Sequence, residues 1–262
     1  MDFVLVALLG FLYARRARRL GGRVPRARQA SFYAGLALLL VALGLPYENR
    51  LFSMHMLQHV LLGDLAPLAI VAGLTGPVLR PVLALPLVER LRVLAHPLIA
   101  LPLWATNLVV WHLPPLYEAA LGNALVHVLE HACFFTFGAL MWAPVIEVLP
   151  GPAWFGTAWK LGYMVAVRLF ETVLGNVFFW SGTVFYRTYA DAERTWQISA
   201  LADQGIAGGV MMLEGSLVTI GALAWLFLKL AAEGELRQQL LERGVDPRAV
   251  ERAVRYGRAH EL

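Results

Sequence analysis

The chain has 262 residues, of which 59% are hydrophobic and only 15% are charged, whereas about 25% of the residues of an ordinary soluble domain are charged. This composition excludes an ordinary soluble domain and predicts a polytopic α-helical membrane protein, because a segment in lipid must satisfy its backbone polar groups internally. The net charge is +4, but the basic residues gather in particular loops, which indicates membrane topology rather than nucleic-acid binding. The single cysteine, Cys133, excludes an internal disulfide.

Seven apolar segments follow one another along the chain, and each is predicted to be a membrane-spanning helix. The first is short and is followed by RRARRLGGRVPRAR, so we interpret it as a helix rather than a signal peptide, whose charges would come before the apolar region. The segments lie at about 2–14, 30–46, 51–74, 97–113, 124–146, 158–180 and 205–230. The predicted fold is therefore all-α, with a seven-helix transmembrane domain over 1–230 and a charged helical tail over 231–262.

The basic residues lie mainly on one side of this arrangement. Arginines fill the loop after the first segment, the loop before the fourth and the carboxyl-terminal tail, whereas the other side holds only Arg50, Arg187 and Arg194. Because cytoplasmic loops carry the excess of Lys and Arg, the amino terminus is predicted outside and the tail in the cytoplasm. The predicted contacts of the chain are thus with membrane lipids and not with nucleic acid, and its oligomeric state is left open.

Two pairs of histidines stand at the outer ends of the third and fifth predicted spans. His55 and His59 lie in FSMHMLQHV, and His127 and His131 lie in ALVHVLEHACFF. A spacing of four residues puts both members of a pair on one helix face, about 6 Å apart along the axis. Because both spans enter from the outside, the pairs lie at nearly the same depth. If the two helices are neighbours, they form a site with up to four imidazole ligands, enough for a tetrahedral metal.

Further ligand-type residues are predicted near this level. His112 ends the fourth span in WHLPP. The possible soft ligands are Met54, Met56, Met211 and Cys133. Imidazole suits copper, zinc, iron and nickel, whereas thioether and thiolate select Cu(I). Each of these residues also has a purely structural interpretation, since Met fills irregular gaps and a buried Cys behaves as a small hydrophobe.

Charged residues inside membrane spans require partners. Four are predicted near mid-membrane or in the seventh span: Asp64, Arg168, Glu171 and Glu214. They form either an ion-pair cluster that locks helix packing or a path for protons or metal. Glu130 is predicted either to orient one of the neighbouring imidazoles from behind or to face another helix. Asp203 and Gln204 are predicted to cap the seventh span.

Several motifs, taken together, resemble a known family. They are H-M-L-Q-H-V-L-L-G-D-L-A-P-L at 55–68, W-H-L-P-P-L-Y-E-A-A-L at 111–121, H-V-L-E-H at 127–131 and D-Q-G-I-A-G-G-V-M at 203–211. The chain resembles the CtaG-type cytochrome c oxidase assembly proteins of bacteria with caa-type oxidases, over about residues 30–230. This resemblance implies about seven membrane helices, a place in the bacterial cytoplasmic membrane and a part in forming the copper B centre of the oxidase.

The resemblance also implies copper as the metal, with Cu(I) favoured, and an assembly factor or metallochaperone rather than an enzyme. The implied partner is cytochrome c oxidase subunit I or a copper-donor protein at the outer face. The residues alone leave other functions open. The same histidines suit a membrane zinc metallohydrolase, in which Glu130 or Asp64 would be the general base. A di-iron site would want more carboxylates, two haems would need histidines farther apart than one turn, and histidines that merely pack remain the structural alternative.

Overall fold

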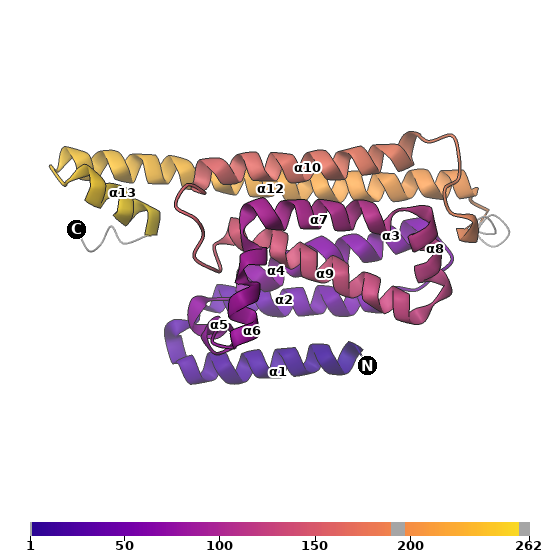
Figure 1. The fold of residues 1–262 in the computed structure, drawn as a ribbon, viewed down its shortest axis with the longest axis horizontal. Coiled ribbons are helices and arrows are strands. Elements are labelled where there is room, and N and C mark those ends of the chain that lie inside the picture. The colour runs from indigo at the N-terminus through magenta and orange to yellow at the C-terminus, as the bar shows by residue number, and fades with distance from the viewer. Residues whose placement is uncertain (1, 190–196, 257–262) are drawn as a thin grey trace. The chain divides into compact units, whose positions relative to one another are not determined.

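The computed structural model describes residues 2–189 and 197–256. Every regular element within these ranges is helical (Figure 1), as the composition predicts. The helices are α1 (Asp2–Leu20), α2 (Arg26–Leu43), α3 (Phe52–Val60), the π-helix η2 (Leu61–Leu65), α4 (Ala66–Gly73), α5 (Gly76–Leu83), α6 (Pro86–Leu91), α7 (Pro97–Trp111), α8 (Pro114–Gly122), α9 (Ala124–Ile146), α10 (Thr157–Trp180), α12 (Ala200–Glu242) and α13 (Pro247–Tyr256). Short 3-10 turns are η1 (Gly21–Arg23), η3 (Arg92–Ala95) and η4 (Arg187–Tyr189).

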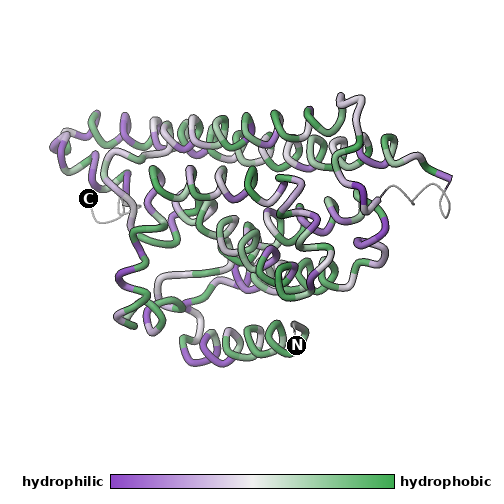
Figure 2. Tube along the Cα trace, turned by 45° about the vertical axis from the view of Figure 1, so that its right-hand side comes forward, coloured by the Kyte–Doolittle hydropathy of each residue, from purple (hydrophilic) through white to green (hydrophobic). Residues whose placement is uncertain are grey.

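Several of these helices are apolar and long enough to cross a bilayer, and Figure 2 shows hydrophobic residues along most of their length. Within the described residues there are four such spans: Phe52–Gly73, Ala124–Ile146, Thr157–Trp180 and Ala200–Glu242. A fifth arises if the pair Pro86–Ala95 and Pro97–Trp111, bent by 81°, counts as one span. These helices are consistent with a multi-pass membrane protein. The helices α1 and α2 are not among these spans; α1 ends in a run of arginines and α2 begins with two. The seven-span count and the orientation therefore stay predictions.

The chain divides into two compact units. The first consists of Met1–Gly151 with Phe170–Glu214, and the second of Pro152–Leu169 with Gly215–Leu262. The helix α12 is continuous through the predicted boundary between residues 230 and 231. The division into a transmembrane domain and a tail stays a prediction. In the second unit, Thr157 donates a hydrogen bond to Glu233 (2.9 Å), and Leu240, Val250 and Val254 form a small core.

In the first unit, glycines let helices approach closely. Gly138 of α9 faces the carbonyl oxygen of Gly63 in η2, and a Cβ added at Gly138 would lie 1.9 Å from that oxygen. Gly35 of α2 is similarly pressed against Ile70 of α4, where an added Cβ would lie 2.6 Å from the side chain. Close packing through small residues is typical of membrane helices. The contact at Gly138 fixes α9 against the span that carries His55 and His59.

The span Phe52–Gly73 is not a regular α-helix throughout. Its middle, Leu61–Leu65, is a π-helix, a rare element that is frequent at functional sites. Pro67 follows near the start of α4 and has no N–H to donate to the carbonyl of Gly63, four residues earlier. That carbonyl lies on the face that Gly138 approaches. The irregular turn thus lies at the junction of the two helices that carry the histidine pairs.

Candidate metal centre

The two predicted histidine pairs face each other in the first unit. His55 and His59 project from α3, and their ring centroids lie 4.2 Å apart. His127 and His131 project from α9, also with 4.2 Å between centroids. Across the helices, His55 lies 5.5 Å from His127 and His59 lies 5.8 Å from His131, centroid to centroid. The juxtaposition that the prediction required is therefore present, and the role of these rings as ligands stays a prediction.

Glu130 lies inside this group of histidines and is fully buried. Its Oε2 is 3.7 Å from Nε2 of His55 and 3.7 Å from Nε2 of His59. Of the two positions that the sequence left open for Glu130, behind an imidazole or against another helix, the structure shows the second, since the carboxylate crosses from α9 to α3. It also lies among the potential donor atoms themselves. The signal was the three-residue spacing from His127, which puts both side chains on one helix face.

The polar atoms of the centre lack hydrogen-bond partners within the described residues. They are both ring nitrogens of His55 and of His59, Nε2 of His127 and of His131, and both carboxylate oxygens of Glu130. A buried polar group without a hydrogen bond costs roughly 1–3 kcal/mol, and native folds seldom leave several together. A bound cation would take up the lone pair of one ring nitrogen from each histidine, together with lone pairs of the carboxylate. Taking one donor atom from each residue, His55, His127 and Glu130 form one compact group, and His59, Glu130 and His131 form another.

His112, just after α7, completes the predicted set of five converging histidines. Its ring centroid is 6.2 Å from that of His59. Its Nδ1 lies 2.6 Å from the carbonyl oxygen of Leu108, and because a carbonyl only accepts, Nδ1 carries the proton. The lone pair is then on Nε2, which lies 3.4 Å from the sulfur of Met56. This tautomer leaves Nε2 and the thioether as an imidazole–sulfur pair beside the four other histidines.

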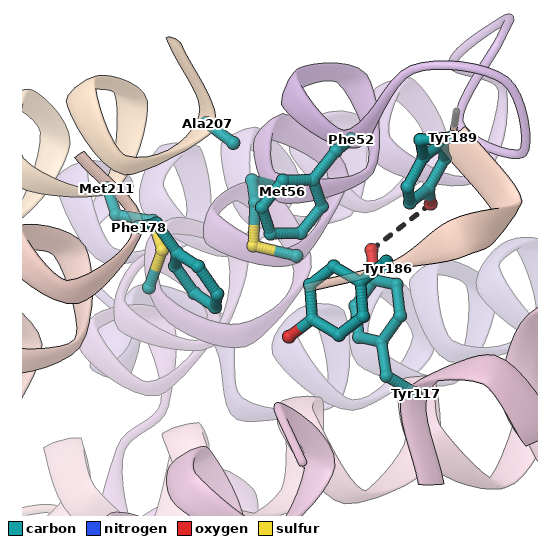
Figure 3. Packing of buried hydrophobic residues seen from close by; sticks show 8 residues of the cluster. All are labelled: Phe52, Met56, Tyr117, Phe178, Tyr186, Tyr189, Ala207 and Met211. Atoms are coloured by element: carbon teal, nitrogen blue, oxygen red, sulfur yellow. Dashed lines mark hydrogen bonds between the residues drawn. The ribbon is translucent and has the colours of Figure 1, made fainter. Parts of the chain in front are cut away.

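The remaining predicted ligands are placed less centrally. Met211 and Met56 belong to one buried cluster (Figure 3), and both line a cavity that His59 and His112 also line. Met54 and Cys133 are only partly buried. Among the described residues, neither compact group of donor atoms includes Cys133. The roles of these four sulfur-bearing side chains as ligands stay predictions.

The buried tyrosines beside the centre were not identified from the sequence. Tyr117 of α8 stacks on Tyr186 with ring centroids 3.9 Å apart, and its hydroxyl lies 3.1 Å from that of Tyr189 (Figure 3). The hydroxyl of Tyr186 donates to the carbonyl of His112 at 2.7 Å. Burial raises the pKa of all three hydroxyls, so they stay protonated. Scattered over α8 and the loop after α10, these residues share no helical spacing that a pattern could reveal.

The acidic residues predicted near mid-membrane partly converge. Asp64, Glu171 and Glu214 line the same cavity of about 50 Å³ as Met56 and His59, which is room for a few waters at roughly 10–15 Å³ each. Asp64 accepts a hydrogen bond from the indole N–H of Trp142 at 2.5 Å. Arg168 belongs to the second unit, where it donates to the hydroxyl of Ser216 at 2.7 Å.

The prediction that Asp203 caps its own helix is wrong. The helix α12 begins at Ala200, and the hydroxyl of Ser199 accepts from the N–H of Ala202. Asp203 instead accepts from the backbone N–H groups of Phe52 (2.6 Å) and Ser53 (3.2 Å), at the start of α3. A carboxylate is favourable there because it satisfies free N–H groups and opposes the helix dipole. Asp203 thus anchors the first turn of the helix that presents His55.

Helical spans and a buried histidine–glutamate cluster define the class of protein as a helical membrane protein with a candidate metal centre. The family model described as cytochrome c oxidase caa3 assembly factor matches residues 9–233. The chain belongs to this family, which confirms the resemblance seen in its motifs.

Several curated proteins are also similar to this chain. Uncharacterized proteins of Mycobacterium bovis and Mycobacterium tuberculosis are each 26% identical over 215 residues, covering 74% of this chain and 32% of their own length. An uncharacterized protein of Mycobacterium leprae is 23% identical over 217 residues, covering 74% of this chain and 33% of its own. The chain thus spans about a third of the length of these relatives. No solved structure matches it.

Proposed function

We propose that the protein is a copper-binding membrane assembly factor that helps deliver copper to a caa3-type cytochrome c oxidase. The family membership supports the link to the oxidase. The observation that carries the metal part is the buried centre, in which four histidines and Glu130 hold donor atoms without hydrogen-bond partners among the described residues. A packing role would leave those atoms unsatisfied at considerable cost. A bound metal ion lowers this cost, because it takes up the lone pair of one nitrogen of each ring and those of the carboxylate.

In this proposal the chain lies in the bacterial cytoplasmic membrane with seven spans, the amino terminus outside and the tail, residues 231–262, in the cytoplasm. The asymmetry of the arginines supports this orientation. The centre then lies near the outer face, where copper arrives. The partner is subunit I of the oxidase or a copper-donor protein on that side, and the role is carriage of a metal rather than catalysis.

The primary ligands in this proposal are His55, His59, His127 and His131. Imidazole nitrogen is a good copper ligand, and thioether sulfur selects Cu(I). The Nε2 of His112 and the sulfur of Met56, 3.4 Å apart, provide such a mixed pair next to the centre. Met211 lines the same cavity. These three side chains offer the copper a softer set of ligands through which it passes when it leaves the histidine cluster.

A zinc metallohydrolase that uses the same cluster is the second candidate. One observation favours it: each compact group contains two histidines and one glutamate, which is the ligand set of several catalytic zinc sites. Zinc as the metal of the purified protein, weak Cu(I) binding and hydrolytic turnover would together establish this alternative in place of copper carriage.

The test compares the wild-type protein with a variant in which the four paired histidines are all changed to Ala. His96→Ala is the matched control, because His96 lies at the start of α7, where its ring accepts from the N–H of Leu98. We expect the purified wild type and the control to bind Cu(I) tightly in a competition titration, and the quadruple variant to lose binding. In a host that makes a caa3-type oxidase and lacks its own assembly factor, the quadruple variant should fail to restore copper to the oxidase. Full restoration by that variant would contradict the proposal.

A further inference from the structure

The donor atoms of the centre do not form one compact group. Within the described residues they form two groups, and in each the donor atoms lie within 4.8 Å of one another. His55 and His127 belong to the first, and His59 and His131 belong to the second. Glu130 belongs to both. Each group takes one histidine from α3 and one from α9, so the geometry offers two places for a cation.

We propose that the centre holds two metal ions side by side, with Glu130 as their shared ligand. This inference rests on the proposed function only in taking the ions to be copper. Oε2 of Glu130 lies 3.7 Å from Nε2 of both His55 and His59, so the carboxylate stands equally close to both places. Neighbouring ligands around a tetrahedral metal with bonds of ~2.0–2.1 Å are about 3.4 Å apart. Closing these contacts onto ions therefore requires only small movements.

The chemistry of Glu130 suits a bridging position. A carboxylate has two oxygens with about four lone-pair sites and accepts from more than one partner. Both oxygens are fully buried and lack hydrogen-bond partners among the described residues. By contrast Asp64, the nearby buried carboxylate of η2, is already held by the indole of Trp142. Glu130 is thus the carboxylate that both histidine groups share.

The charge of the centre favours two Cu(I) ions over two divalent ions. Histidines bind metals as neutral imidazoles, so Glu130 supplies the one negative charge of the two groups. Two Cu(I) ions leave the centre with a single net positive charge, whereas two divalent ions leave three. A net charge in a buried site is costly, so when both places are filled, two Cu(I) ions are more stable there than two divalent ions. The number of places follows from the two groups of donor atoms.

The experiment is an anaerobic Cu(I) titration of the full-length protein in detergent, with a chromophoric competitor and direct metal analysis. We expect two tightly bound equivalents in the wild type and in His96→Ala. His127→Ala and His131→Ala remove one histidine from different groups, so each should keep one equivalent. Glu130→Gln should bind the second equivalent at least tenfold more weakly, since it lacks the shared negative charge. Circular dichroism of each apo variant checks that the helices remain folded.

Other results would overturn the inference in distinguishable ways. A single equivalent in the wild type, lost in both His127→Ala and His131→Ala, would show one ion among four histidines and would leave copper carriage intact. Two wild-type equivalents in Glu130→Gln would remove the shared-ligand role. Two equivalents of Zn(II) with no tight Cu(I) would retain the two-ion centre and overturn the copper function. X-ray absorption at the copper edge should show nitrogen or oxygen neighbours, and a shell of sulfur alone would place the copper elsewhere.

Discussion

The candidate metal centre and the tyrosine cluster beside it differ in whether their buried polar groups have hydrogen-bond partners. The ring of His55 contacts the ring of Tyr117, with centroids 5.0 Å apart, so the two regions adjoin. In the tyrosine cluster every hydroxyl has a partner: Tyr117 pairs with Tyr189, Tyr186 donates to the carbonyl of His112, and Tyr189 donates to the carbonyl of Glu48. In the centre, none of the carboxylate oxygens or imidazole Nε2 atoms has a hydrogen-bond partner among the described residues.

The same fold therefore satisfies the buried polar groups of the tyrosine cluster and leaves those of the candidate metal centre without hydrogen-bond partners among the described residues. The difference lies in the acceptor groups that each set of side chains can reach. The tyrosine hydroxyls bond to one another and to carbonyls outside regular helices. The histidines lie within helices whose own carbonyls are engaged in the backbone hydrogen bonds of the helix. The tyrosine cluster, with its hydroxyls bonded, packs beside the histidines and helps to hold their unpaired donor atoms in place. This is the arrangement expected of a preorganised binding site.

The largest effect should come from Gly138→Ala, which touches neither region directly. A methyl group at this position meets the carbonyl oxygen of Gly63, a backbone atom that cannot turn aside. We expect a loss of stability at the upper end of the ~1–3 kcal/mol that overpacking costs, and loss of Cu(I) binding, because α9 must move away from α3. The measurement is thermal unfolding with a Cu(I) titration.

Gly162→Ala is the control for this substitution. Gly162 lies in α10, and nothing lies within 4 Å of a Cβ built there. Alanine is the better helix former by up to about 1 kcal/mol, so this variant should be unchanged or slightly more stable. Wild-type Cu(I) affinity in Gly138→Ala would show that the distance between α3 and α9 does not determine Cu(I) binding.

The second effect concerns the anchor of α3. Asp203→Ala removes the carboxylate that accepts from the N–H groups of Phe52 and Ser53, and loss of a cap costs about 0.5–2 kcal/mol. We expect a lower melting temperature and weaker Cu(I) binding, since His55 lies in the turn that loosens. Asp203→Asn should recover part of both, because an amide oxygen still accepts. Equal losses in the two variants would mean that the charge of Asp203, and not its cap, matters.

These residues show how far the sequence alone leads. The spacing of the histidines predicted the pairs, and the apolar segments between residues 30 and 180 match helices to within a few residues, because both depend on the local sequence. The helices α1 and α12 extend beyond their predicted segments, and α5, α6 and α8 were not predicted. The partner of Asp203 depended on a contact between segments 150 residues apart. The close approach at Gly138 likewise depends on packing between α9 and the third predicted span, where the π-helix at Leu61–Leu65 lies. Such contacts leave no periodic signal in a single sequence.

A smaller effect should follow from Tyr186→Phe in the satisfied region. The change removes the hydroxyl that donates to the carbonyl of His112 and keeps the stacked ring. We expect a loss of about 1 kcal/mol, the usual net value of such a hydrogen bond. Tyr33→Phe, at an exposed position in α2, is a control for the same chemical change. Cu(I) stoichiometry should not change, and a lost equivalent would show that the tyrosine cluster is part of the site itself.

The smallest effect should have the opposite sign. Glu130→Gln removes a buried carboxylate that, in the protein without metal, faces imidazoles instead of a cation. Burying an uncompensated charge is unfavourable. The free energy of unfolding of the apo variant should therefore equal that of the apo wild type or exceed it by up to about 1 kcal/mol, with a melting temperature that is equal or higher. Saturating Cu(I) should stabilise the wild type more than the variant, since a ligand stabilises the state that binds it, and so reverse the order of the two proteins. If the apo variant is clearly less stable, then Glu130 is already paired with a protonated histidine, and the contrast between the satisfied and the unsatisfied region is smaller than the hydrogen bonds indicate.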